Sequence, residues 1–143
     1  MTVEFKRLSS DPEWYWVKSR TGVIQCEDTQ GIVAYKDTEI VAVCVIDTVT
    51  VDSVNVHFAV EYPLVIKHGF FHEIARHVFE VLGKQRMFGL VPADNAKALK
   101  IDQNIGFKEV ARIPHGYRTG EDLVVLKMER EECRFAPQIE EAA

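Results

Sequence analysis

The chain has 143 residues, enough for one domain, and 47% of them are hydrophobic, as in ordinary soluble globular proteins. Its net charge of −5 gives no general attraction to nucleic acid or to anionic membranes, so neither is expected as a partner. The three cysteines are odd in number and lack C-x-x-C spacing, which argues against a disulfide framework or a thiolate zinc site. The apolar run Ile40–Ile46 is too short to span a bilayer and no signal-peptide core opens the chain, so a cytoplasmic protein is expected.

The N-terminal segment predicts a short strand followed by a short helix. Val3–Leu8 suits a first strand. Asp11 is expected to cap a helix with Pro12 at its first position, and this helix should end near Thr21-Gly22. The aromatic rings that open it either anchor the helix to a sheet or line a nearby cleft; they are Trp14, Tyr15 and Trp16.

A β-hairpin rich in Val and Ile follows. Its predicted strands are Gly31–Lys36 and Glu39–Asp47, with a turn at Asp37-Thr38. A second turn near Thr50–Ser53 leads into the next strand. These segments predict an antiparallel meander that feeds the centre of the chain.

The centre reads as strand, helix, strand, helix. Val54–Val60 alternates apolar with other residues, and Pro63 ends that strand. From Gly69 to Gly83 the spacing becomes helical, with a first apolar stripe and a second one beside it. The first stripe consists of Phe70, Ile74, Val78 and Val81, and the second of Phe71, Ala75, Phe79 and Leu82.

A second strand–helix pair completes this unit. Met87–Val91 is a short apolar strand, Asp94-Asn95 supplies a helix N-cap, and Gly106 stops the helix. A strand–helix–strand unit of this length favours a right-handed crossover, so Val54–Val60 and Met87–Val91 should be parallel neighbours.

The C-terminal part predicts two more strands and a tail. Lys108–Ile113 is expected to be a strand, 114–121 a polar loop, and Leu123–Met128 a strand buried on both faces. Residues 1–130 should form a single domain, and the acidic residues 131–143 a flexible tail.

Two sets of residues resemble the GNAT superfamily of acyl-CoA-dependent N-acetyltransferases. Pro63 and Gly69 match the first Pro and Gly of its pyrophosphate loop, P-x-x-R-x-x-G-x-G/A. The pattern N-x-x-A-x-x-L-Y-x-x-x-G-F of its later helix is matched by Asn95, Ala98, Ile101, Gly106 and Phe107. The resemblance implies a mixed, mostly antiparallel, twisted sheet flanked by helices.

Three positions depart from the family pattern, so the chain resembles a divergent member. Ile66 replaces the arginine or glutamine of the loop, and Phe71 replaces its last small residue. Asp102 stands where a tyrosine often serves as general acid. An aspartate is ionised at pH 7 unless it is desolvated, so the usual acid is expected to be absent. Phe71 would crowd the loop unless its ring turns into the core.

The resemblance implies acetyl-CoA as co-substrate and assigns its contacts. The backbone around Val60, Glu61 and Tyr62 would pair with the pantetheine arm, and Asn95 would reach the same arm or simply cap its helix. The pyrophosphate would lie at the N-terminus of the first central helix, because free N–H groups and the helix dipole favour anions there. The residues concerned are Lys67, His68, Gly69 and Phe70.

The candidates for proton transfer are His57, Glu61 and Tyr117. His57 and Glu61 share one strand face, about 13 Å apart, and a glutamate there needs a pKa raised by burial to act as a base. Glu61 could equally be a solvated carboxylate at a strand end. Tyr117 or His115 could replace the missing acid, although loop residues of these types are common without any such role.

A metal site is not expected. His68 and His72 have i,i+4 spacing, but two ligands do not make a site, and 72–77 reads as a solvated helix face. The sequence therefore predicts transfer of an acetyl group from acetyl-CoA to a small-molecule amine or a protein amino group, by a monomer or a homodimer. The alternative is a catalytically inactive GNAT-fold binding or structural module of the kind that phages encode.

Overall fold

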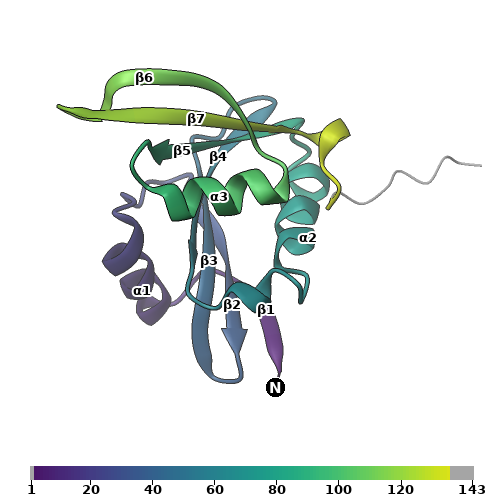
Figure 1. Cartoon of the computed structure of the whole chain (residues 1–143). Helices are drawn as coiled ribbons and strands as arrows, with labels where there is room; N and C mark the ends of the chain where they lie inside the picture. The colour runs from purple at the N-terminus through teal and green to yellow at the C-terminus, as the bar shows by residue number, and fades with distance from the viewer. Residues whose placement is uncertain (1, 136–143) are drawn as a thin grey trace, which may run out of the picture.

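A computed structural model describes residues 2–135 of the chain, which fold into one twisted sheet with helices on both faces (Figure 1). The described strands are β1 (Val3–Arg7), β2 (Gln30–Lys36), β3 (Glu39–Asp47), β4 (Ser53–Val60), β5 (Arg86–Pro92), β6 (Lys108–Arg118) and β7 (Glu121–Glu129). The helices are α1 (Asp11–Thr21), α2 (Phe70–Ala75), its π-helical continuation η2 (Arg76–Val81) and α3 (Ala96–Ile105), with short 3₁₀ turns η1 (Pro63–Val65) and η3 (Arg130–Glu132).

The sheet order is β1-β2-β3-β4-β5-β7-β6, and every neighbouring pair is antiparallel except β4 and β5. The crossover through α2 makes β4 and β5 parallel, with Val54 opposite Met87. The predicted architecture and this parallel pair are therefore confirmed. No helix among the described residues has both the length and the apolar character needed to cross a membrane.

Helix α1 covers one face of the sheet, and α2 and α3 cover the other (Figure 1). Val17 of α1 is fully buried against Val33, Val43 and Val45. On the other face, the larger core contains the buried rings of Phe70 and Phe71 from α2. It also contains Phe107, which follows α3 and is 3% exposed. The predicted burial of Phe107 is thus confirmed, and its ring centroid lies 6.1 Å from that of Phe58.

The start of α1 differs from the prediction by one residue. Ser10, not Asp11, is the N-cap, and its hydroxyl accepts a hydrogen bond from Glu13 N–H at 3.3 Å. The Glu13 carboxylate accepts in return from the N–H of Ser10 at 3.0 Å, which completes a capping box. The helix ends as predicted, with Gly22 in the left-handed conformation. The prediction overlooked that a serine three residues before a glutamate forms this reciprocal pair.

The second half of the predicted central helix is π-helical. Because a π turn adds a residue per turn, side chains after Ala75 are rotated relative to a regular helix. Val81, predicted on the buried stripe, is 46% exposed. His77, predicted on a solvated face, is instead 3% exposed, and its Nε2 lies 2.9 Å from Gln30 Oε1.

The C-terminal hairpin is longer and more exposed than predicted. β6 continues through Pro114 to Arg118, so most of the predicted loop 114–121 is strand, with irregular pairing beyond Ile113. β7 alternates between buried and partly exposed residues, rather than being buried on both faces, because β6 and β7 form the end of the sheet. Most of the predicted tail lies outside the described residues.

Candidate active site

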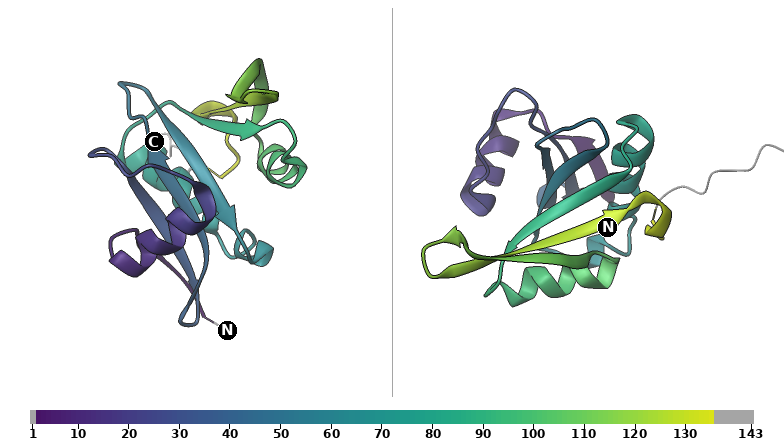
Figure 2. Two further views of the ribbon diagram at one scale, coloured as in Figure 1. Left: turned by 90° about the vertical axis from the view of Figure 1, so that its left-hand side faces the viewer. Right: turned by 90° about the horizontal axis from the view of Figure 1, so that it is seen from above.

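Strands β4 and β5 pair over only four residues and then separate. Their paired register runs from Ser53–Arg86 to Val56–Gly89. Beyond Gly89, β5 remains paired with β7 as far as Pro92, whereas β4 remains paired with β3 as far as Val60. Both views in Figure 2 show the two strands diverging. Within residues 2–135, the edge of β4 that faces β5 therefore has no strand beside it after Val56.

A cavity of about 500 Å³ occupies this gap. Its walls come from the end of α1, the separated halves of β4 and β5, helix α3, and the β6–β7 hairpin. The lining residues are Arg20, Thr21, Gly22, Val23, Val56, His57, Phe58, Ala59, Val60, Leu90, Val91, Pro92, Asn95, Lys97, Ala98, Ile101, Asp102 and Tyr117. Of the predicted site residues, the cavity brings together His57, Val60, Asn95 and Tyr117.

His57 is oriented by a carboxylate that the sequence did not single out. Its Nε2 lies 2.9 Å from Asp47 Oδ1 at the end of β3, and both side chains are about three-quarters buried or more. Asp47 is paired with Asn55, so His57 lies diagonally across the strand pair. A histidine held through one ring nitrogen by a carboxylate keeps a defined orientation and tautomer, which suits proton transfer through the other nitrogen.

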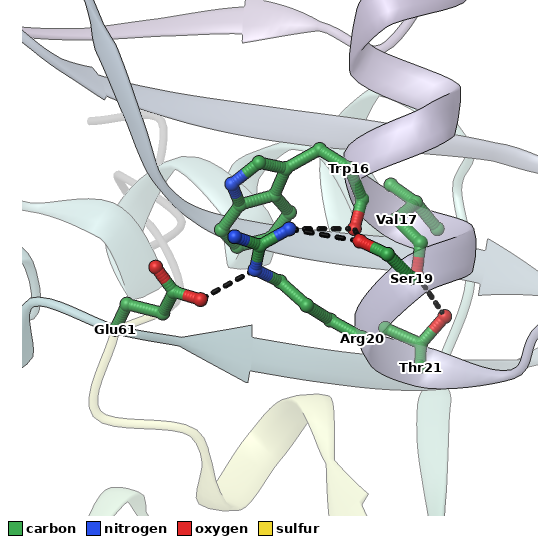
Figure 3. A network of polar contacts seen from close by, with 6 residues as sticks. All are labelled: Trp16, Val17, Ser19, Arg20, Thr21 and Glu61. Atoms are coloured by element: carbon green, nitrogen blue, oxygen red, sulfur yellow. Dashed lines mark hydrogen bonds and ion pairs between the residues drawn. The ribbon is translucent and has the colours of Figure 1, made fainter.

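Glu61 lies just after β4 and is paired with Arg20 of α1 (Figure 3). The Arg20 guanidinium also stacks 4.0 Å from the Trp16 ring centroid and donates to Ser19 Oγ. Arg20 thus connects the end of α1 to the end of β4 at the cavity wall. The α1 aromatic rings do not line the cavity: Trp14 is buried, Tyr15 is 77% exposed, and Arg20 covers Trp16.

Asp102 lies where β4 and β5 part. It projects from α3, is only 5% exposed, and borders the cavity. Gly89 is the last residue of β5 that pairs with β4, and a Cβ placed on it would lie 3.6 Å from Asp102 Oδ2. Burial raises the pKa of Asp102 to about 7, so the carboxyl group is about half protonated at neutral pH. The expectation of an ionised aspartate is stated for a carboxyl group that is not desolvated, and packing of α3 on the sheet does desolvate this one.

The N-terminus of α2 is more closed than the sequence suggests. The N–H groups of Lys67, His68 and Gly69 already donate to the carbonyls of the preceding 3₁₀ turns. The N–H groups that have no partner within the helix are those of the first turn of α2, from Phe70 onward. Gly69 has φ 98°, and Phe71 is buried against the Phe58 ring at 5.1 Å, so its ring does turn into the core.

The remaining predicted residues have defined places. Asn95 caps α3 by accepting a hydrogen bond from Ala98 N–H at 3.1 Å, as predicted, and also lines the cavity. The N–H of Tyr62 donates to the Val41 carbonyl, toward β3. His115 stabilises the hairpin turn, accepting from Gly120 N–H at 2.8 Å. Within residues 2–135, no three His, Cys, Asp or Glu side chains are grouped to hold a metal ion.

The sequence did not predict that Asp47 contacts His57 or that Arg20 pairs with Glu61, nor did it predict the raised pKa of Asp102. The hairpin register, readable from the turn at Thr50–Ser53, places Asp47 one diagonal step from His57 and could have found that pair. The raised pKa of Asp102 depends on burial by segments distant in sequence. No local signal reports it.

No protein-family model and no curated protein sequence matches the chain, whereas solved structures do. A spermidine/spermine N-acetyltransferase from Vibrio cholerae superposes with a TM-score of 0.74 at 8% identity, covering 90% of this chain and 93% of that one. The ribosomal-protein-S18-alanine N-acetyltransferase from Escherichia coli superposes with a TM-score of 0.70 at 16% identity, covering 99% of each chain. A protein described as a GNAT-family acetyltransferase from Desulfovibrio desulfuricans superposes with a TM-score of 0.72 at 16% identity, covering 90% of this chain and 99% of that one. At these identities the similarity establishes the GNAT fold.

Proposed function

We propose that this protein is an acetyl-CoA-dependent N-acetyltransferase. The observation that carries the proposal is the open edge of β4 beyond Val56, which borders a cavity instead of a strand. An unpaired strand edge offers backbone hydrogen-bonding groups to an extended ligand, as an added strand would use them. The pantetheine arm of CoA carries two amide groups and suits such an edge.

The residues around the gap are consistent with this co-substrate. Backbone groups from His57 to Val60 and near Tyr62 would hold the amides, with Asn95 on the opposite wall. The pyrophosphate would lie at the first turn of α2, where Phe70 begins the helix and Gly69 keeps the approach free of a side chain. Exposed Lys67 and His68 would add positive charge. When bound, the thioester supplies the activated acetyl group.

His57 is the proposed general base. Its free ring nitrogen would take a proton from the acceptor amine, while Asp47 orients the ring and stabilises the imidazolium that forms. Tyr117, half exposed over the cavity, would contact the acceptor. Glu61 remains a candidate for acceptor binding or proton transfer through water, although its carboxylate is already paired with Arg20.

The acceptor would be an amine, either a small molecule or a protein amino group. The structurally similar acetyltransferases act on spermidine or spermine and on an alanine of a ribosomal protein. We therefore choose spermidine and a peptide that begins with alanine as first acceptors. Both can be assayed by the thiol that is released from acetyl-CoA.

The test is calorimetric titration of acetyl-CoA into the protein, followed by the thiol-release assay with each acceptor. We expect saturable binding of one acetyl-CoA per chain, and acceptor-dependent thiol release that falls at least tenfold in His57→Gln. Absence of heat and of any thermal shift at millimolar acetyl-CoA would overturn the proposal. Binding without transfer to any amine would favour the alternative, a non-catalytic binding module. Sedimentation of the same samples distinguishes a monomer from a homodimer.

A further inference from the structure

The Asp102 side chain is buried and borders the cavity. Its residue is 5% exposed, yet among residues 2–135 no hydrogen bond or ion pair reaches the carboxyl group. The Asp102 oxygens are not among the fully enclosed side-chain atoms of the described residues that lack a hydrogen-bond partner, so they reach the cavity and are not sealed in the core. Such a group facing a cavity is therefore available to a ligand.

The groups around Asp102 do not neutralise it. Cys44 of β3 is fully buried, and its own burial, together with Asp102, raises the pKa of its thiol. The other titratable groups on the cavity wall are Arg20 from α1, His57 from β4, Lys97 from α3 and Tyr117 from β6, and none is bonded to Asp102. The proton on Asp102 is thus free to move to a bound molecule.

We propose that Asp102 is the proton donor of the acetyl transfer, placed at the apex of the gap where β4 and β5 separate. The proposal rests on the proposed function. The amine nitrogen forms a bond to the acetyl carbon, the carbon–sulfur bond breaks, and its electron pair goes to sulfur. The Asp102 proton goes to that sulfur, and the proton of the amine goes to His57. Solvent then restores both groups.

The geometry separates the donor from the acceptor of protons. Side chains alternate along β4, so His57 and Ala59 lie on the α1 face, whereas Phe58 packs on the α2–α3 face with Asp102. The two groups therefore reach the gap from opposite sides of the sheet and do not exchange protons directly. A carboxylic acid with a pKa of about 7 also protonates a thiolate readily, since thiols have pKa values near 8.5.

The test compares wild type with Asp102→Asn, which keeps the shape and removes the acidic proton. Asp94→Asn is the matched control, because Asp94 is exposed just before the same helix and does not line the cavity. Three quantities are measured: the Asp102 carboxyl titration by ¹³C NMR, acetyl-CoA affinity by calorimetry, and kcat for thiol release between about pH 5.5 and about pH 9, which brackets the pKa values involved.

We expect the Asp102 resonance to titrate near neutrality, and Asp102→Asn to bind acetyl-CoA within about threefold of wild type while kcat falls about 10²–10⁴-fold. Wild-type kcat should decline above about pH 7 as Asp102 ionises, a decline that the variant lacks. Asp94→Asn should match wild type in all respects. An Asp102 carboxyl titration with its midpoint below about pH 5, or a wild-type kcat in Asp102→Asn, would overturn the role of Asp102 and leave the proposed function intact. Failure of the wild type to bind acetyl-CoA or to release thiol would overturn both.

Discussion

At the scale of single residues, a buried carboxyl group marks the centre of the site and also lowers stability. Asp102 holds its proton up to about pH 7 in the folded protein, whereas an unfolded aspartate releases it near pH 3.8. Between these values the folded state binds more protons than the unfolded state. The contribution of Asp102 to stability therefore decreases as pH rises through this window and is constant above it.

This linkage predicts the pH dependence of Asp102→Asn. The asparagine side chain does not ionise, so the variant should gain stability relative to wild type as pH rises from about 4 to about 7, by up to about 4 kcal/mol. Urea unfolding of both proteins at several pH values measures the difference. A difference that does not change between pH 4 and pH 8 would show that Asp102 is ionised normally.

Phe107 provides an independent check on the core. Its ring is 3% exposed between α3 and the sheet. Truncating such a ring to alanine costs about 3–5 kcal/mol, a large part of a small domain's stability. Phe107→Ala should therefore lower the melting temperature by well over ten degrees, whereas Val110→Ala, at a half-exposed position on β6, should lower it by a few degrees at most. Equal shifts would be inconsistent with the described core.

At the scale of elements, the site depends on β4 having different partners along its length. Its first half pairs with β5, and its second half faces a cavity. Alternation in Val54–Val60 predicts the strand, and the crossover predicts its parallel neighbour. Neither predicts where the pair opens, because that point is set by the pairing of β5 with β7, which lies more than thirty residues further along the chain.

The N-terminus of α2 can be tested with two glycines of the same backbone conformation. Gly69 has φ 98° and Gly83 has φ 68°, and a Cβ at either position would meet no atom closer than 3.9 Å. Valine at either position should therefore destabilise the fold similarly, through backbone strain rather than steric contact. Only Gly69→Val should also weaken acetyl-CoA binding, by at least tenfold in calorimetry. Equal affinities in the two variants would show that the phosphate groups do not bind at the N-terminus of α2.

Ile66 offers a gain-of-function counterpart. It stands where the family loop carries arginine or glutamine, and it is only partly buried beside the core. Ile66→Arg should place a guanidinium near the first turn of α2 and strengthen acetyl-CoA binding by about 1–3 kcal/mol, a factor of about five to 150. Titration at one fixed salt concentration measures this, with Ile66→Gln as an uncharged comparison. Unchanged affinity in both would mean that the phosphates lie elsewhere.

At the scale of the whole molecule, the fold followed from periodicity and the site followed only in part. Strand alternation, turn residues and the Gly106 stop predict the element order, since each depends on neighbours in sequence. The Asn95 cap and the position of His57 were also predictable. The burial of His77 depends on a π-helical segment, and the raised pKa of Asp102 depends on packing of α3 against the sheet, so both required the three-dimensional structure.

The most direct test of the central claim is amide hydrogen exchange along β4 with and without 1 mM acetyl-CoA, about the level at which weak binding is detectable. The proposed function predicts that exchange slows at amides between His57 and Val60 that face the gap, while Val54 and Val56, already inside paired strands, change little. If the open edge of β4 exchanges at the same rate in both samples, acetyl-CoA does not bind between these strands and the account is wrong.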